Sequence, residues 1–569
     1  MVFSRPAQFY RQNFKFILLA TIACLLALAW WQRFVLDDAF ISFRYADNMA
    51  RGWGLVWNEG ERIEGYTNFL WTVLMAVPLF LGLDVVRFSM MLGLLSFAAS
   101  LYFTYRFALI VLTSRTAALV TIIMLGTNYT FCRYATSGME TQLQACIFIT
   151  TLYALVSAQE SGRWTNSRLL IISLLLSLAL LTRLDSALLF AVSVPAALLP
   201  IVKEKTAMTR KAAKLICLCA PPAALVGGWL VWKLYYYGDI LPNTFYAKVS
   251  SLNSYIEGLN YLYYFFLYYW LFPLFLIPVL AARRIFSRVN YGLSLSLLVT
   301  ALWLLYVVKV GGDFMEFRFI VPIMPFLFVI IGWLIFSLIN NTILRAACVS
   351  LVIAGSVYHA ETPALMGGVE PIEGLARHVS GSECWEDTGK VLGKALNYDR
   401  SVRIAVTAAG AIPFYSRLTT IDMLGLNDRW VARNGSVIGD RPGHQRMASV
   451  QYMMDRRVNL VLGAAQPMYR YLNMPTFGDI PSAFNGFLLP MEAPGEDMPK
   501  TSKLIEIPIN PELKIAVMYL FPSAVVDEAI SREGWRTYPL VVSGADQTTW
   551  PENFPYYKPG TRITFSDEQ

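Results

Sequence analysis

The chain has 569 residues, of which 56% are hydrophobic and 15% charged, and its mean hydropathy is +0.47. This composition argues against a single soluble globule and favours a protein with many membrane spans. The formal net charge of +8 does not indicate a nucleic-acid partner, because no basic tail is present and scattered Lys and Arg are typical of loops that fix membrane orientation.

The first apolar run covers residues 16–31 and follows three basic residues near the N-terminus. It leads into Gln32 and Arg33 rather than a cleavage site of small residues. We therefore expect an uncleaved first membrane span.

Apolar stretches that reach, or nearly reach, the roughly 20 residues needed to cross a bilayer recur along the first two thirds of the chain. They cover residues 14–34, 87–112, 116–134, 140–158, 168–182, 186–202, 213–236, 258–281, 290–310, 319–339 and 342–359. A further stretch, 67–83, is short and contains Pro78. If the N-terminus is cytoplasmic and 67–83 does not cross, the basic loops all face the cytoplasm, as the positive-inside rule requires. We predict eleven spans and a juxtamembrane or re-entrant helix at 67–83.

With this orientation, the loops that hold unusual polar residues all lie on the outer face. They are residues 35–86, 132–142, 181–188, 238–249 and 310–319. Activated nucleotides are cytoplasmic, so a reaction on the outer face would draw on a lipid-linked donor.

The stretch DDAFISFRYADN follows the first span directly and has helical character. On a helix, Asp37, Arg44 and Asn48 share one stripe. We assign activation of a substrate to Asp37, because it shares that stripe, and capping of the helix to Asp38, because it immediately precedes Ala39. Structural alternatives apply to the other charged loop residues: Glu140 could cap a helix, and the basic residues could bind lipid headgroups.

Beyond residue 360 the composition becomes that of a soluble protein. Alternating apolar residues predict strands near 402–406, 458–462 and 513–517. We therefore predict an α-helical polytopic membrane module over residues 1–359 and an extracytoplasmic α/β or α+β domain over residues 360–569.

Seven motifs between residue 37 and about residue 428 resemble, in order, those of the GT-C polyprenyl-phosphate-dependent arabinofuranosyltransferases. They read DDAFISFRYADN, GLVWNEGERIEGYTNFLW, SGMETQL, LTRLDSAL, LPNTFYAK, GGDFMEFRFIVPIMP and IDMLGLND. The family includes the transferase that completes mycobacterial cell-wall arabinan and Gram-negative relatives that modify pilin. The chain departs from the family at LTRLDSAL, where relatives commonly read RPDG, and this weakens any role for Asp185.

The resemblance implies three groups of site residues. The catalytic acidic residues would be Asp37, Asp38 and Glu140. The donor phosphate would be held by Arg44, Lys248 and Arg318. The sugar or lipid head would meet Tyr66, Asn68, Asn243, Tyr246 and Asp313.

The implied reaction moves D-arabinofuranose from a polyprenyl phosphate to a glycan or protein acceptor outside a bacterial inner (plasma) membrane. An acidic residue would activate the acceptor hydroxyl, and basic residues would stabilise the departing phosphate. No metal site is predicted from ligand spacing, although a divalent cation could share the phosphate. Two alternatives stay open: a transferase of another lipid-linked sugar, such as mannose or aminoarabinose, and a lipid-sugar transporter or flippase.

Overall fold

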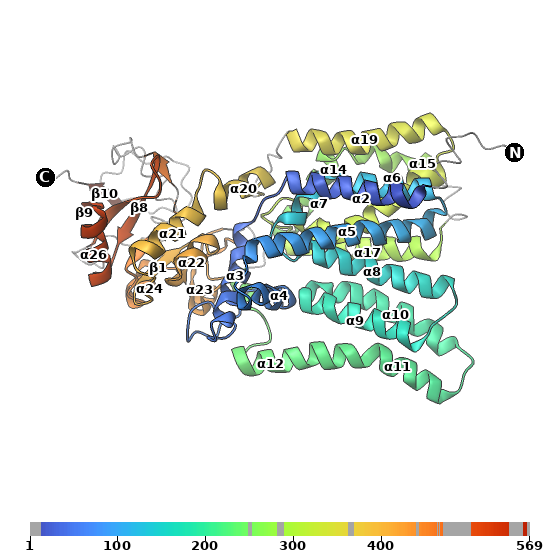
Figure 1. Ribbon diagram of the computed structural model, residues 1–569, viewed down its shortest axis with the longest axis horizontal. Coiled ribbons are helices and arrows are strands. Elements are labelled where there is room, and N and C mark those ends of the chain that lie inside the picture. Colours follow the sequence, from blue (N-terminus) through green and yellow to red (C-terminus); the bar gives the residue numbers. More distant parts are fainter. Residues whose placement is uncertain are drawn as a thin grey trace.

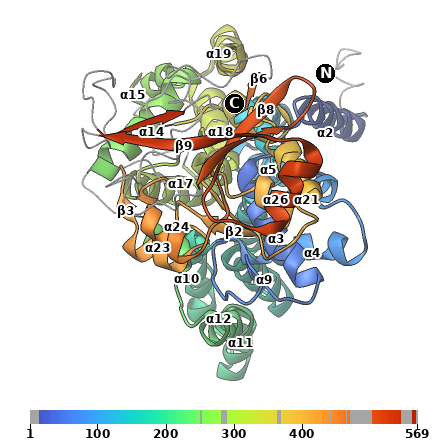
Figure 2. The same ribbon diagram turned by 90° about the vertical axis from the view of Figure 1, so that its left-hand side faces the viewer.

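The computed structural model describes residues 13–248, 253–280, 289–361, 369–439, 443–463, 465, 467–469, 502–544 and 561–565. Its long helices form a bundle in one half of the molecule, and its strands lie in the other half (Figure 1). Figure 2 looks onto the strand-containing half, which covers one end of the bundle and leaves α11 and α12 at the edge.

Within the described residues, eight helices are long and apolar enough to cross a bilayer, or nine if a bent pair counts as one span. They are α2 (Phe14–Trp31), α5 (Val85–Leu112), α8 (Thr141–Glu160), η2 with α10 (Leu184–Lys203), α11 through α12 (Met208–Tyr237), α17 (Tyr291–Val310), η5 through η6 (Arg318–Leu338) and α19 (Thr342–Glu361). Shorter apolar helices are α4 (Phe69–Phe80), α6 (Arg115–Gly126) and α9 (Asn166–Thr182). Every stretch predicted from the sequence falls on one of these helices or on the bent pair, and the polytopic helical fold is confirmed.

Two predicted spans are interrupted. The stretch 258–281 is broken, because α14 (Asn253–Tyr268) and the segment Phe272–Leu280, which contains α15 (Leu276–Leu280), meet at 95°. Trp270 has a left-handed backbone with φ of +53°, and Pro273 opens the next turn without an N–H to donate. The stretch 116–134 also breaks after Gly126, and α7 (Tyr129–Arg133) restarts it with Asn128 as its cap.

Helix α3 (Asp37–Ala50) lies between the two halves of the molecule (Figure 1). Phe40 and Phe43 on its buried face pack against Phe414 of α22 (Ala411–Ser416), with ring centroids 5.4 and 6.2 Å apart. Helix α3 is therefore the surface on which the C-terminal region docks.

The C-terminal region contains one mixed sheet. Strand β1 (Arg403–Val406) is parallel to β2 (Thr419–Asp422) and β5 (Leu460–Gly463). The sheet continues through antiparallel pairs to β8 (Leu513–Tyr519), β7 (Lys503–Pro508), β9 (Arg536–Gly544) and β10 (Thr561–Phe565), while β6 (Met468–Tyr469) pairs with β8. The predicted strands coincide with β1, β5 and β8, so the mixed fold of this region is confirmed.

Short helices accompany the sheet. They are α20 (Ile372–Ser380), α21 (Trp385–Ala395), α23 (Arg429–Asn434), α24 (Val450–Asp455) and α26 (Ala524–Glu533), and a separate hairpin joins β3 (Ser436–Val437) to β4 (Arg446–Met447). The domain boundary at residue 360 stays a prediction: α19 ends at Glu361, and the next described residue is Val369.

Candidate active site

Asp37 connects the membrane module to the C-terminal region. Its carboxylate accepts hydrogen bonds from the backbone N–H of Gly410 at 3.0 Å and of Ala411 at 2.7 Å. The approach requires glycine at position 410, because a Cβ there would lie 2.0 Å from the carbonyl oxygen of Asp37. Burial raises the pKa of Asp37 to about 7. Asp37 thus fastens α22 onto α3.

Asp38 has the opposite character. No side chain caps the start of α3, so the capping role predicted for Asp38 is wrong. Its carboxylate receives no hydrogen bond from any residue that the structure describes, and it lines a cavity. Burial raises the pKa of Asp38 to about 6, with the charge of Arg318 opposing the rise and the charges of Asp313 and Glu140 adding to it. The pKa values do not separate the two aspartates, but their hydrogen bonding does: Asp37 is held by two backbone N–H groups, whereas Asp38 keeps both oxygens available to a ligand. The catalytic roles of both residues stay predictions.

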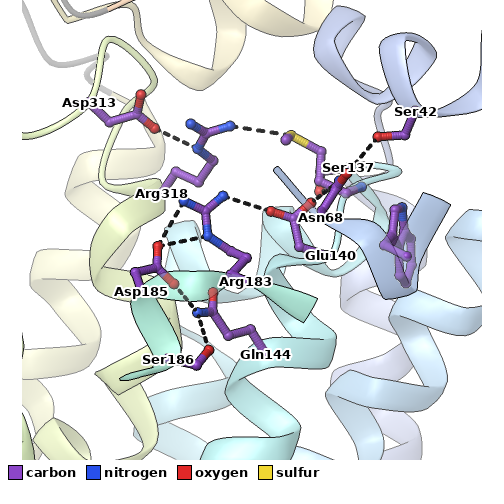
Figure 3. Close-up of polar contacts among 12 residues, drawn as sticks. Ser42, Asn68, Ser137, Glu140, Gln144, Arg183, Asp185, Ser186, Asp313 and Arg318 are labelled. Carbon is purple, nitrogen blue, oxygen red and sulfur yellow. Dashed lines mark hydrogen bonds and ion pairs between the residues drawn. The ribbon is translucent and has the colours of Figure 1, made fainter. Parts of the chain in front are cut away.

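Arg183 is the centre of an ion cluster with Glu140 and Asp185 (Figure 3). Its guanidinium lies 2.9 Å from Glu140 and 2.8 Å from Asp185, and Asn68 donates to Glu140 at 2.7 Å. Burial alone would raise the pKa of Glu140, but Arg183 and the Asn68 hydrogen bond outweigh it and the pKa is lowered. Glu140 is therefore an ionised, fully engaged carboxylate that orders the site.

Asp185 belongs to the same cluster, although the sequence around it departs from the family pattern. Its other oxygen accepts from Gln144 at 2.8 Å (Figure 3). Both oxygens of Asp185 and the three nitrogens of Arg183 are therefore engaged within the cluster.

Arg318 is engaged much less completely. Its Nε donates to Asp313 at 2.5 Å, and its Nη1 contacts only the thioether sulfur of Met139 at 3.6 Å. Within the described part of the chain, no oxygen accepts from the remaining N–H groups. Since guanidinium groups bind phosphate oxygens through paired N–H donors, Arg318 retains the capacity predicted for it.

Lys248 follows α13 (Asn243–Ala247) and borders this group. Its side chain is exposed, yet protein surrounds it closely enough that desolvation lowers its pKa, with Asp313 acting in the opposite direction. Lys248 is therefore a second cation on the Arg318 side of the site.

The structure does not bring Arg44 to this group. Its guanidinium donates to the backbone oxygens of Trp57 at 2.9 Å and Leu418 at 2.8 Å, to Asn58 at 3.0 Å, and to Pro413. Four of its five N–H groups are thereby used, two on the loop that follows α3 and two on the C-terminal region. The structure therefore gives Arg44 a structural role in place of the predicted phosphate-binding one.

Three further predicted residues also have structural partners. The hydroxyl of Tyr66 lies 3.0 Å from that of Tyr237, and Asn243 donates to the backbone of residues 425, 426 and 428. Tyr246 donates to Asp239 at 3.0 Å. These side chains hold loops at this end of the helix bundle in place or join them to the C-terminal region, so of the predicted sugar or lipid contacts only Asn68 and Asp313 lie in the cluster.

A cavity of about 330 Å³ lies between α3 and the C-terminal region, with Asp37 and Asp38 in its wall. The remaining wall includes Phe314, α20, α21 and the loops after β1 and β2. Several wall residues, among them His378 and Trp385, were not predicted, because no motif in the C-terminal region indicated them. This volume is in the range of small-molecule sites.

No group of three or more His, Cys, Asp or Glu side chains is placed to hold a metal among the described residues. The oxygens of Glu140 and Asp185 face Arg183, Asn68 and Gln144. Participation of a divalent cation stays a prediction, and the chemistry below is argued from the side chains.

Comparison with known proteins gives a family match in the C-terminal region and a named relative that matches about half of the chain. Residues 378–494 match a family described as a domain of unknown function (DUF8728). A terminal beta-(1->2)-arabinofuranosyltransferase of Mycobacterium tuberculosis is 27% identical over 336 residues, covering 51% of this chain and 51% of that protein. The match thus spans about half the length of this relative.

The fold is that of ArnT from Cupriavidus metallidurans. The crystal structure of ArnT bound to undecaprenyl phosphate superposes with a TM-score of 0.52 at 12% identity, over 90% of this chain and 99% of that one. The apo structure gives a TM-score of 0.50 at 12% identity, over 89% and 98%. The chain therefore has the fold of the GT-C glycosyltransferases, and the resemblance of its motifs to the arabinofuranosyltransferases of that fold is confirmed.

Proposed function

We propose that the protein transfers D-arabinofuranose from a polyprenyl phosphate to a hydroxyl group of an extracytoplasmic glycan or protein acceptor. The observation that carries the proposal is the position of Asp38. It has no hydrogen-bond partner within the described residues, it faces the cavity, and its charge interacts with that of Arg318, whose N–H groups are largely available.

Each group has one task in this reaction. Asp38 takes the proton of the acceptor hydroxyl as the new bond to the sugar forms. The bond between the sugar and the phosphate oxygen breaks, and polyprenyl phosphate leaves with an added negative charge. Arg318 and Lys248 stabilise that charge, while Arg183, Glu140 and Asp185 hold the floor of the site in place.

The choice of donor is supported by the relatives. One relative is named an arabinofuranosyltransferase, and a structure of the same fold was solved with undecaprenyl phosphate. The basic loops predict that the site faces outward from a bacterial inner membrane. There a lipid phosphate can deliver a sugar without a nucleotide.

Purified protein incubated with a panel of polyprenyl-phosphate sugars tests the proposal. We expect consumption of the arabinofuranose lipid, with release of polyprenyl phosphate, and much slower consumption of the mannose and aminoarabinose lipids. For the variant Asp38→Asn, which should consume the lipid far more slowly, the matched control is Asp47→Asn. Asp47 also lies on α3, but it pairs with Arg51 at 2.7 Å. Faster consumption of another sugar lipid would reassign the donor, and movement of a lipid across vesicles without its consumption would indicate a transporter instead.

A further inference from the structure

The two sides of the proposed site differ in how their charges are balanced. On the side of the membrane module the cations Arg183, Arg318 and Lys248 lie among the carboxylates of Glu140, Asp185 and Asp313, so positive and negative groups offset each other. On the side of the C-terminal region, the cavity wall holds Glu370 and Glu383, and no lysine or arginine is among the described residues that line it. Asp38 lies between the two sides.

The acidic wall is organised around a histidine. His378 Nε2 lies 2.8 Å from Glu370 and 3.6 Å from Glu383. Burial lowers the pKa of His378, but the two glutamates outweigh it and the pKa is raised. A protonated His378 neutralises only part of the wall, so the cavity stays acidic.

An aromatic residue in the same wall has an unused donor. Trp385 is 8% exposed and stacks on His378 with ring centroids 4.4 Å apart. Its indole Nε1–H has no hydrogen-bond partner within the part of the chain that the structure describes. Buried donors are nearly always paired. This unpaired N–H belongs to a residue of the cavity wall, so a ligand oxygen would satisfy it once a small shift of the ring exposes it.

We propose that this cavity binds the acceptor and selects an uncharged sugar over a phosphorylated or carboxylated one. The proposal rests on the proposed function for the identity of the reaction, but the charge and shape of the cavity argue it separately. Carboxylates accept hydrogen bonds from sugar hydroxyls, and an indole offers an N–H and an apolar face. The same carboxylates repel an anionic acceptor, which would otherwise compete with the donor phosphate for Arg318.

Binding to the purified full-length protein tests this inference without any turnover. The probes are a short neutral arabino-oligosaccharide and a matched oligosaccharide that ends in a uronic acid. We expect the neutral probe to bind at least about tenfold more tightly, because an uncompensated like charge costs on the order of one factor of ten or more. Equal binding, or tighter binding of the uronic acid, would overturn the proposal.

Two variants locate the binding in this cavity. Trp385→Phe keeps a ring on His378 but removes the N–H, and it should weaken binding of the neutral probe by about fivefold to tenfold. Glu383→Gln removes one negative charge from the wall, so it should reduce the ratio between the dissociation constants of the uronic acid probe and the neutral probe. Trp430→Phe and Glu386→Gln are matched controls, because Trp430 stacks on Tyr452 elsewhere and Glu386 pairs with Lys390. Equal effects of variants and controls would also overturn the proposal.

The failure of this inference differs from failure of the proposed function. Suppose that no lipid-linked sugar is consumed, while the neutral probe still binds and Trp385→Phe weakens its binding. In that case the proposed transfer reaction is wrong and the cavity is still supported as a binding site. If Trp385→Phe and Glu383→Gln both consume the arabinofuranose lipid at the normal rate, with an unchanged KM for the acceptor, the transfer reaction is supported. The assignment of this cavity to the acceptor is then wrong.

Discussion

Asp38 and Asp37 differ because of what approaches them, not because of their position in the helix. Asp37 meets backbone N–H groups 373 and 374 residues further along the chain. Asp38 lines the same cavity as Asp37 but accepts no hydrogen bond from any described residue. A stripe drawn on an isolated helix identifies which residues share a face, but it cannot identify the face that a distant segment will cover.

The pKa of Asp38 predicts the pH dependence of the reaction. Below a pH of about 6 the carboxyl is protonated and cannot accept a proton, so kcat/KM should fall about tenfold per pH unit and level off above that pH. Arg318 lowers this pKa, so Arg318→Gln should move the acidic limb to higher pH as well as slowing turnover. A pH–rate profile of each protein checks both expectations. If the acidic limb of Arg318→Gln lies at the same pH as that of the unchanged protein, Arg318 does not influence the pKa of Asp38.

Arg318 should also control the use of the donor phosphate. Arg318→Lys keeps the charge but loses the paired N–H geometry, so it should raise the KM for the lipid donor, and Arg318→Ala should impair turnover more. Arg345→Lys is the matched control, because Arg345 donates only to the backbone oxygens of residues 336 and 339 and does not belong to the site. Wild-type kinetics in Arg318→Ala, with normal yield, would assign this residue to lipid headgroups.

At the scale of the element, hydropathy was sufficient to place the helices. The predicted apolar stretches are helical, although 116–134 and 258–281 are each divided between two segments, because about 20 apolar residues in sequence leave few alternatives to a helix. The 95° bend after α14 was not predicted, although Pro273 and Pro278 lie in that stretch, since an apolar run gives no information about its own direction. The docking of α22 onto α3 was also not predicted, because a local sequence pattern carries no information about contacts between residues more than 370 positions apart.

That docking depends on a single small residue. A Cβ at position 410 would lie 2.5 Å from the carboxyl carbon of Asp37, so Gly410→Ala should separate α22 from α3. We expect a lower thermal unfolding temperature and a loss of activity together. Gly227→Ala is the matched control, because a Cβ there meets nothing within 4 Å. Equal unfolding temperatures for the two variants would contradict the tight contact.

For the whole molecule, the sequence predicted two halves and their order along the chain. It did not predict that α3 would join them, because Arg44 and Asp37 find their partners in the C-terminal region only once both halves are folded. The site is formed by this junction. Most of its membrane-side residues could be named from motifs, whereas the cavity wall from α20 and α21 could not.

The orientation of the molecule is a separate prediction. In a cysteine-free background, a cysteine at Glu528, which is exposed on α26, should react with an impermeant thiol reagent added to intact cells. A cysteine at Lys205, in the loop between α10 and α11, should react only after the membrane is opened. Labelling of the Lys205 position in intact cells would reverse the orientation.

The proposed mechanism assigns general-base catalysis to Asp38 and the attachment of α22 to α3 to Asp37. Single-turnover rates of purified, monodisperse Asp38→Asn and Asp37→Asn with the arabinofuranose lipid test it most directly. The account predicts that Asp38→Asn loses roughly 10²-fold or more in rate with unchanged thermal stability, while Asp37→Asn loses less rate and more stability. A larger loss of rate in Asp37→Asn, or full activity in both variants, would contradict it.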